Sequence, residues 1–131
     1  MTIAVEDLTA YLKANAGINA IVAGRVWPQN IPQNAVLPGL VYKEISGVRP
    51  STLEGATGLN NGRYEFGCVA LDYLAAKQLS QAVRQALSKL RAIIGSTEIL
   101  DTSLLMERDV YDSLTLEYRV DLDFQIWHRE P

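Results

Sequence analysis

The side chains that could carry out chemistry in this sequence are few. The 131 residues include one histidine, His128, and one cysteine, Cys68. A catalytic histidine needs a nucleophile and an orienting group around its ring, so we expect this lone residue to be a surface histidine at the end of a strand. Cys68 alternates with Phe66 and Ala70, which predicts a buried and unreactive thiol. One cysteine and one histidine also exclude zinc sites built from several such ligands.

Two carboxylates form the second candidate site. Asp121 and Asp123 lie on the same face of Leu116–Trp127, in which apolar and polar residues alternate with a period of two. Paired carboxylates can bind a hard cation or act as an acid and a base. Arg119 shares their face, however, and alternating charges are typical of the solvated side of a strand. We therefore expect a wet, acidic strand face and no metal site.

The glycine-rich stretch between residues 47 and 62 is the third candidate. It lacks the Gly-Lys-Ser/Thr ending of a phosphate-binding loop, and a strand rather than a helix follows it. Arg49 and Arg63 flank its glycines but are too few to form a basic patch. Its composition instead predicts a long, flexible loop, and irregular segments of this length often carry function.

Both tryptophans are candidates for a contact surface. Trp27 precedes a proline-punctuated extension, where it could pack over the edge of the core or anchor a partner. Trp127 falls on the polar face of the last strand, where an exposed indole is typical of an interface.

The elements that would position these residues follow from apolar periodicity and from the placement of glycine and proline. The sequence predicts, in order, a short N-terminal helical pair ending at Gly24, a strand over Leu40–Ser46, a strand over Arg63–Leu71, a long helix over Tyr73–Ile94 capped by Asp72, and strands over Ile99–Asp109 and Leu116–Trp127. Their alternation favours antiparallel pairing. The expected fold is α+β: a four-stranded, mainly antiparallel sheet with the long helix and the N-terminal helical pair packed on one face, in a single domain over residues 1–131.

Composition and charge narrow the class of protein. Hydrophobic residues make up 48% of the chain, the formal net charge is −3 and the pI is about 5.1. An acidic chain of this kind is not typical of a dedicated nucleic-acid binder. No apolar run approaches the ~20 residues of a membrane span. We therefore expect a compact soluble domain with no cofactor and no membrane partner.

Four stretches together carry a resemblance to a known family. They are Gly24-Arg25-Val26-Trp27-Pro28 after the helical pair, the proline-led Leu37-Pro38-Gly39-Leu40-Val41-Tyr42, the passage from Tyr64 to Tyr73 that runs into Ala82-Val83-Arg84, and the closing strand from Tyr118 to Ile126. In this order and spacing the chain resembles the bacteriophage tail-completion proteins, of tail terminator or head–tail joining type. The resemblance covers essentially the whole chain.

The resemblance implies a structural function without enzymatic activity. It implies a small α+β subunit, made in the host cytoplasm, that assembles as a ring at the head-proximal end of the tail tube of the virion, commonly in six copies. The ring would end tube growth and join the tail to the head. Its partners would be other copies of the chain, the tail tube protein and a head–tail connector protein, with DNA only as passing cargo. The residues expected at these interfaces are Trp27, Arg49, Leu53, Leu59, Arg63, Asp121, Asp123 and Trp127.

Two alternative functions fit the same order of elements. The subunit could belong to a connector ring on the head side of the neck, or it could be a ferredoxin-like regulatory domain that binds a small molecule. An enzyme is disfavoured because the sequence offers no nucleophile–base pair. If the acidic strand face lined the channel of a ring, it would repel DNA and reduce sticking during passage.

Overall fold

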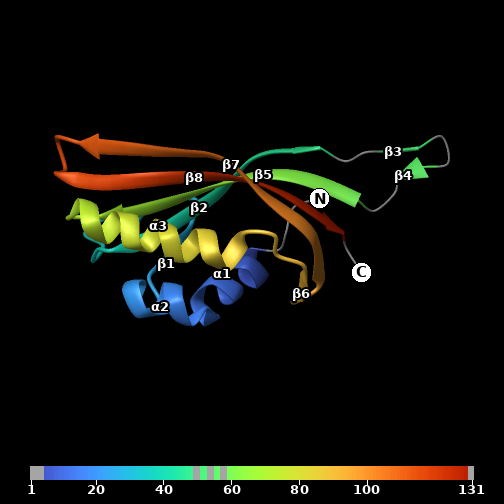
Figure 1. Cartoon of the computed structure of the whole chain (residues 1–131), viewed down its shortest axis with the longest axis horizontal. Helices are drawn as coiled ribbons and strands as arrows, with labels where there is room; N and C mark the ends of the chain where they lie inside the picture. The colour runs from blue at the N-terminus through green and yellow to red at the C-terminus, as the bar shows by residue number, and fades with distance from the viewer. Residues whose placement is uncertain (1–4, 49–50, 53–54, 57–58, 130–131) are drawn as a thin grey trace.

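The computed structural model describes residues 5–48, 51–52, 55–56 and 59–129. This part of the chain forms three helices and a large sheet. Figure 1 shows how they are arranged. The helices are α1 (Val5–Ala14), α2 (Ala16–Val22) and α3 (Tyr73–Leu87). The strands of the large sheet are β1 (Val26–Pro28), β2 (Gly39–Val48), β5 (Leu59–Ala70), β6 (Ala92–Ile94), β7 (Thr97–Asp112) and β8 (Glu117–Arg129). Two short strands, β3 (Ser51–Thr52) and β4 (Gly55–Ala56), form a separate small sheet.

Within the described residues the large sheet has six strands, in the order β1-β2-β5-β8-β7-β6. β1 runs parallel to β2, and every other neighbouring pair is antiparallel. The prediction of a four-stranded, mainly antiparallel sheet is therefore wrong, because the sheet is mixed and has two additional strands. β2, β5, β8 and β7 correspond to the four predicted strands. Alternation does not predict β1 and β6, because three residues are too few to show a period of two.

One apolar core fills the space between the helices and one face of the sheet, here called the inner face (Figure 1). α3 contributes Leu79, Val83 and Leu87 to this core. β8 contributes every second residue from Val120 to Ile126, and each of these is at most 1% exposed. Burial of apolar surface is the main favourable contribution to folding, so this alternation fixes which face of β8 meets the helices.

The long helix α3 ends at Leu87 rather than at the predicted Ile94. The Thr102 hydroxyl of β7 donates a hydrogen bond to the Leu87 carbonyl and accepts one from the Leu90 amide. Lys89 between them adopts a φ of +54°, which leaves the helical conformation. These contacts to β7 stop the helix and turn the chain into β6, although the apolar spacing in the sequence continues through the turn.

The stretch between residues 47 and 62 is strand wherever the structure describes it. β2 and β5 remain paired within the large sheet, with Gly47 opposite Gly62 and Val48 opposite Asn61, and β3 pairs with β4 further along. The expected irregular loop is therefore wrong for the described part. Backbone pairing between the strands orders glycine and polar residues that a single segment could not order alone. Arg49 and Leu53 lie outside the described residues.

Candidate interaction surface

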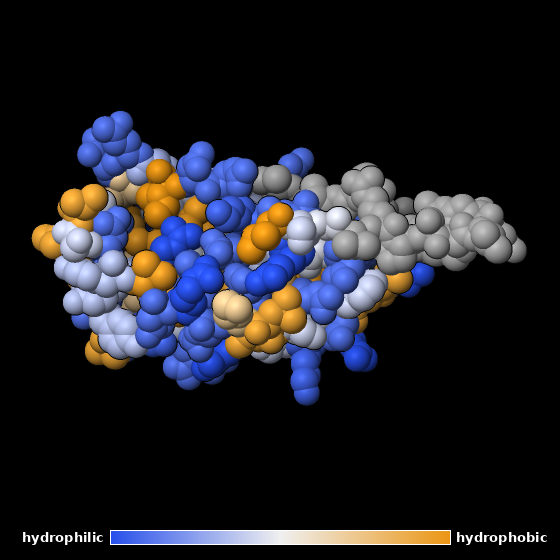
Figure 2. All heavy atoms as spheres, turned by 90° about the horizontal axis from the view of Figure 1, so that it is seen from above, coloured by the Kyte–Doolittle hydropathy of each residue, from blue (hydrophilic) through white to orange (hydrophobic). Residues whose placement is uncertain are grey.

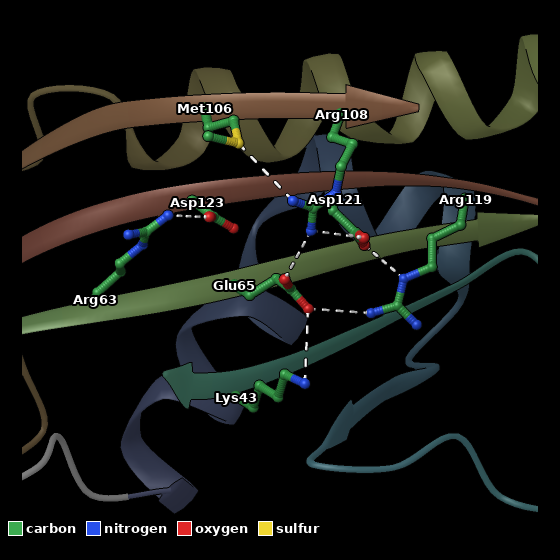
Figure 3. Close-up of polar contacts among 8 residues, drawn as sticks. All are labelled: Lys43, Arg63, Glu65, Met106, Arg108, Arg119, Asp121 and Asp123. Carbon is green, nitrogen blue, oxygen red and sulfur yellow. Dashed lines mark hydrogen bonds and ion pairs between the residues drawn. The ribbon is translucent and has the colours of Figure 1, made fainter. Parts of the chain in front are cut away.

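A cluster of charged side chains covers the outer face of the sheet, which is the face opposite the helices. Strand alternation places it there: the residues between the buried apolar ones of β8 point outward, and β2, β5 and β7 supply their cross-strand neighbours. The charged cluster, shown in Figure 3, comprises Lys43, Arg63, Glu65, Arg108, Arg119, Asp121 and Asp123.

Glu65 on β5 is the centre of the larger part of the charged cluster. Its carboxylate lies 3.2 Å from Arg108 and 3.4 Å from Arg119, and the Lys43 ammonium is 3.9 Å away. The same two arginines reach the carboxylate of Asp121, Arg108 at 3.4 Å and Arg119 at 2.5 Å. Ion pairs therefore join four neighbouring strands, β2, β5, β8 and β7, across the outer face.

Arg63 and Asp123 form a separate pair at the side of this network (Figure 3). A guanidinium nitrogen of Arg63 lies 2.7 Å from Oδ2 of Asp123. Asp123 is 3% exposed, whereas 41% of the Arg63 side chain is exposed. Oδ1 of Asp123 and Nε of Arg63 are also buried, and neither makes a hydrogen bond among the described residues. The charge of this buried carboxylate is therefore balanced by one arginine.

The prediction that Asp121 and Asp123 form a wet, acidic strand face is wrong, because both carboxylates are buried beside arginines. Asp121 is only 6% exposed, because the long side chains of Arg108 and Arg119 lie over the short aspartate. Four cations surround three carboxylates in the charged cluster, which leaves it positive by one. Repulsion of DNA by Asp121 and Asp123 has no support in this arrangement. Glu65 and Arg108 complete the cluster, and strand alternation is the signal that could have identified them.

Trp27 lies apart from Leu59 and Trp127, which are diagonal neighbours on the adjacent strands β5 and β8. Trp27 covers Gly39, where an added Cβ would come within 2.3 Å of the indole ring, so this tryptophan packs over the edge of the sheet. Trp127 lies on the outer face as predicted, but it is half-buried rather than fully exposed. Leu59 begins β5 opposite Arg129 and is also half-buried. The structure therefore places Arg63, Asp121 and Asp123 in the charged cluster, and Trp27, Leu59 and Trp127 are not part of it.

An apolar patch that strand alternation does not indicate lies where the β7–β8 turn meets the start of α3. The ring of Tyr118 lies 5.9 Å from that of Tyr73 and 4.7 Å from that of Tyr111, measured between centroids. The exposed leucines that lie near these tyrosines in the sequence are Leu71, Leu74, Leu114 and Leu116. Figure 2 shows apolar side chains gathered at this end of the molecule. We call this patch the apolar tip, and such patches are typical of protein contact sites.

Both sides of the large sheet are only partly covered by their outermost strands. β6 pairs with β7 over Thr97–Ile99, and β1 pairs with β2 over Leu40–Tyr42. Among the described residues, Leu100–Asp112 of β7 and Lys43–Val48 of β2 therefore have no further strand beside them. The exposed apolar side chains along the open part of β7 are Leu104, Leu105, Met106, Val110 and Tyr111. Uncovered strands of this kind are ready to pair with another chain.

His128 and Cys68 both lie in the interior. His128 is 1% exposed and faces the core, so the expectation of a surface histidine is wrong. Cys68 is buried as predicted, and burial raises the pKa of its thiol, which disfavours the reactive thiolate. In the described ranges, no three His, Cys, Asp or Glu side chains come together in a group that could hold a metal ion. The described helices include none that is long and apolar enough to span a membrane.

Comparison with known proteins gives a family and a fold. Residues 6–129 match the family described as "Tail completion protein gp17". The chain is also similar to a chain of the solved structure described as "Virion of native gene transfer agent (GTA) particle", with a TM-score of 0.71 and 20% sequence identity over 98% of this chain and 99% of that chain. No curated protein sequence matches. Because the family match spans nearly the whole sequence and confirms the resemblance carried by its four stretches, the chain belongs to the tail completion protein gp17 family.

Proposed function

We propose that this phage tail protein assembles as a ring of identical subunits at the head-proximal end of the tail tube, where it ends tube growth and joins the tail to the head. Family membership supports a structural role in the virion. The similarity in fold to a chain of a gene transfer agent virion is consistent with assembly among other virion proteins. We propose six copies in the ring, a number taken from the family resemblance.

The observation that carries the proposal is the pair of uncovered edges on opposite sides of one sheet. β2 lies near one side and β7 near the other, so the two edges are different surfaces of the subunit. Contacts between two different surfaces of identical subunits run head to tail, and they close into a ring when the rotation from one copy to the next completes a full turn. A contact of one edge with its own copy would instead be twofold and would stop at a dimer.

The apolar tip offers a surface for a second partner. It lies at the ends of β7 and β8 and at the start of α3, and Tyr111 is the residue that it shares with the open part of β7. Neighbouring copies at the edges would therefore leave it accessible. We assign it to the contact with the tail tube protein, and we place the head–tail connector protein on the opposite end of the ring, with DNA passing through the centre.

Electron microscopy of particles produced without this protein tests the proposal. We expect overlong tails, or tails that are not attached to heads. Supplying the wild-type protein should restore normal particles, whereas Leu114→Asp in the apolar tip should not, because it places a charge at a side chain that is 94% exposed and free to enter a contact. Val36→Asp is the matched control, since Val36 is also an exposed apolar residue but belongs to the segment between β1 and β2 rather than to the tip.

Two results would contradict this assignment. Normal virions without the protein would exclude a role in ending or joining the tail. Tails of normal length beside heads that lack a neck would assign the subunit to the head side instead.

A further inference from the structure

The register of the sheet places the uncovered segments of β2 and β7 in the same cross-strand rows. Following cross-strand partners from one edge to the other gives two rows: Lys43, Glu65, Asp123 and Met106, and Val48, Asn61, Trp127 and Asp101. Residues 43–48 on β2 therefore span the same rows as residues 101–106 on β7. Neither segment is covered by β1 or β6, which pair with residues 40–42 and 97–99.

The strand directions are also suitable for joining these two edges. β2, β5, β8 and β7 are successively antiparallel, so β7 runs opposite to β2. In a ring whose axis is parallel to the strands, each copy is related to the next by a rotation about that axis. Such a rotation does not reverse the strands, so β2 of the neighbouring copy runs in the same direction as β2 of the first copy. The neighbouring β2 would therefore lie antiparallel to β7 of the first copy, and the alternation of the sheet would continue from one subunit to the next.

Each of the two edges has an exposed aliphatic residue at a bulge. The register of β2 shifts between Glu44 and Ser46, and that of β7 shifts between Leu104 and Met106. The bulge residues are Ile45, which is 44% exposed, and Leu105, which is 49% exposed. Both flank the row that contains Glu44, Tyr64, Phe124 and Leu104. If the edges met, these two side chains would lie close enough to bury each other.

The β7 bulge also resolves a steric problem. β1 occupies the position beside residues 40–42 of β2, so a strand lying along residues 43–48 must turn aside where it meets Pro28, the last residue of β1. That point corresponds to the level of Glu107 in β7, directly after the bulge at Leu105. Bulges bend the strand that contains them, and β7 would therefore leave the neighbouring β2 at this point.

The open part of β7 has the composition of an interior strand. Leu104 lies on the inner side of the sheet, opposite Phe124, and Met106 lies on the outer side, opposite Asp123. Both are exposed, although apolar residues on both faces are typical of strands with neighbours on every side. Charged side chains on an edge strand usually prevent it from pairing with another chain. Here Glu107 forms ion pairs with Lys77 and Arg84 of α3, and Arg108 forms ion pairs within the charged cluster.

There is space for an added strand beside residues 101–104 of β7. A hollow of about 430 Å³ lies there, between the turn after α3 and β7. Its lining residues are Ser88, Lys89, Arg91, Asp101, Thr102, Ser103 and Leu104. The β7 residues that line it follow the end of the β6 pairing and share their cross-strand rows with the open segment of β2.

From these observations we propose that neighbouring copies of this chain join edge to edge, residues 101–106 of β7 in one copy pairing antiparallel with residues 43–48 of β2 in the next. The proposal rests on the ring function given above and names its subunit contact. The sheets of all copies would then form one continuous β-structure around the ring, with Leu105 of each copy against Ile45 of its neighbour.

Disulfide trapping tests this pairing directly. We would introduce Ile45→Cys and Leu105→Cys together in the full chain and oxidise the concentrated protein with diamide, the buried Cys68 being left in place. Head-to-tail pairing should give a ladder of cross-linked species that ends at the ring size. The single variants should give no cross-link with themselves, and an equal mixture of the two should give dimers only.

Two controls make the result specific. A chain carrying Leu105→Cys with Val36→Cys should give no ladder, since Val36 is exposed but lies outside the edge. Adding Met106→Lys to the cross-linking pair should reduce the ladder at least tenfold while leaving the fold intact, whereas Leu114→Lys in the apolar tip should leave the ladder unchanged.

The outcomes separate the pairing from the function. Absence of a ladder in the concentrated double variant, or self-dimers of Leu105→Cys alone, would overturn the edge pairing. If rings were still seen on tails in either case, the proposed function would stand with a different contact. Normal virions without the protein would instead remove the function, whatever the cross-linking shows.

Discussion

Replacing Arg63 by methionine should destabilise the protein, although almost half of the Arg63 side chain reaches solvent. The guanidinium lies 2.7 Å from Asp123, whose side chain is 4% exposed. Oδ1 of Asp123 has no hydrogen bond among the described residues, so the carboxylate depends on this one arginine. Methionine keeps an unbranched apolar chain of similar length but removes the charge and the donor. The variant therefore leaves a buried carboxylate without its cation.

The expected magnitude follows from the burial of the two partners. Breaking a fully buried ion pair by removing one partner costs about 3–5 kcal/mol. Because 41% of the Arg63 side chain is exposed, water can replace part of its contact, and we expect a loss of about 2–3 kcal/mol in the free energy of unfolding. In a chain of this length that corresponds to a Tm lower by about 8–12 °C. The double variant Arg63→Met/Asp123→Leu should recover most of the loss, because an apolar replacement of a buried pair is often neutral.

Urea unfolding followed by tryptophan fluorescence measures these changes for the wild type, the single variants and the double variant. Arg129→Met is the matched control, because Arg129 and Glu98 form a pair in which both side chains are about half exposed. Loss of such a surface pair should cost less than about 1 kcal/mol. A loss below about 0.5 kcal/mol for Arg63→Met would refute the reasoning, since a change of that size is typical of an ordinary surface substitution.

Three further changes test other parts of the structure. Thr102→Val removes the hydroxyl that bonds the Leu87 carbonyl and the Leu90 amide, and urea unfolding should show a loss of about 1–3 kcal/mol. Gly39→Ala places a Cβ within 2.3 Å of the Trp27 ring, so the indole must move; its fluorescence should shift to the red and stability should fall by about 1–3 kcal/mol, and an unchanged spectrum would contradict the packing. Hydrogen bonds from Lys77 and then from Tyr73 hold the pKa of Asp109 below its usual range, so the stabilisation they give should be present at neutral pH and lost as the pH falls through that lowered pKa. The difference in Tm between the wild type and Asp109→Asn should therefore be small but measurable at neutral pH and should vanish in acid; a constant difference would contradict the assignment.

The sequence predicts the interior of this fold better than its periphery. Alternation from Val120 to Ile126 correctly identifies the last strand and the side of it that faces the core. The same alternation assigns Asp121 and Asp123 to a wet face, because it carries no information about arginines from other strands. Arg63 and Arg108 lie far from these aspartates in sequence, and only the strand register brings them into contact.

The edges of the sheet show a second limit. The apolar spacing after Leu87 continues through Leu90 and Ile94, which predicts helix, but the hydroxyl of Thr102 ends the helix from a different strand. β1 and β6 are held by pairing with longer neighbours and have no pattern of their own. Among the candidate contact residues, the run Leu104–Met106 is apolar without alternation. That break in the pattern is the signal that could have identified the open edge of β7 from the sequence.

The position and copy number of this chain in the particle test the central claim most directly. Cryo-electron microscopy of the neck region, with the chain identified by fitting the sheet and its three helices into density, measures both. We expect a closed ring of six copies between the last ring of the tail tube and the head–tail connector. Density for this chain elsewhere in the particle, or in isolated copies without contact between neighbours, would contradict a ring that ends the tail.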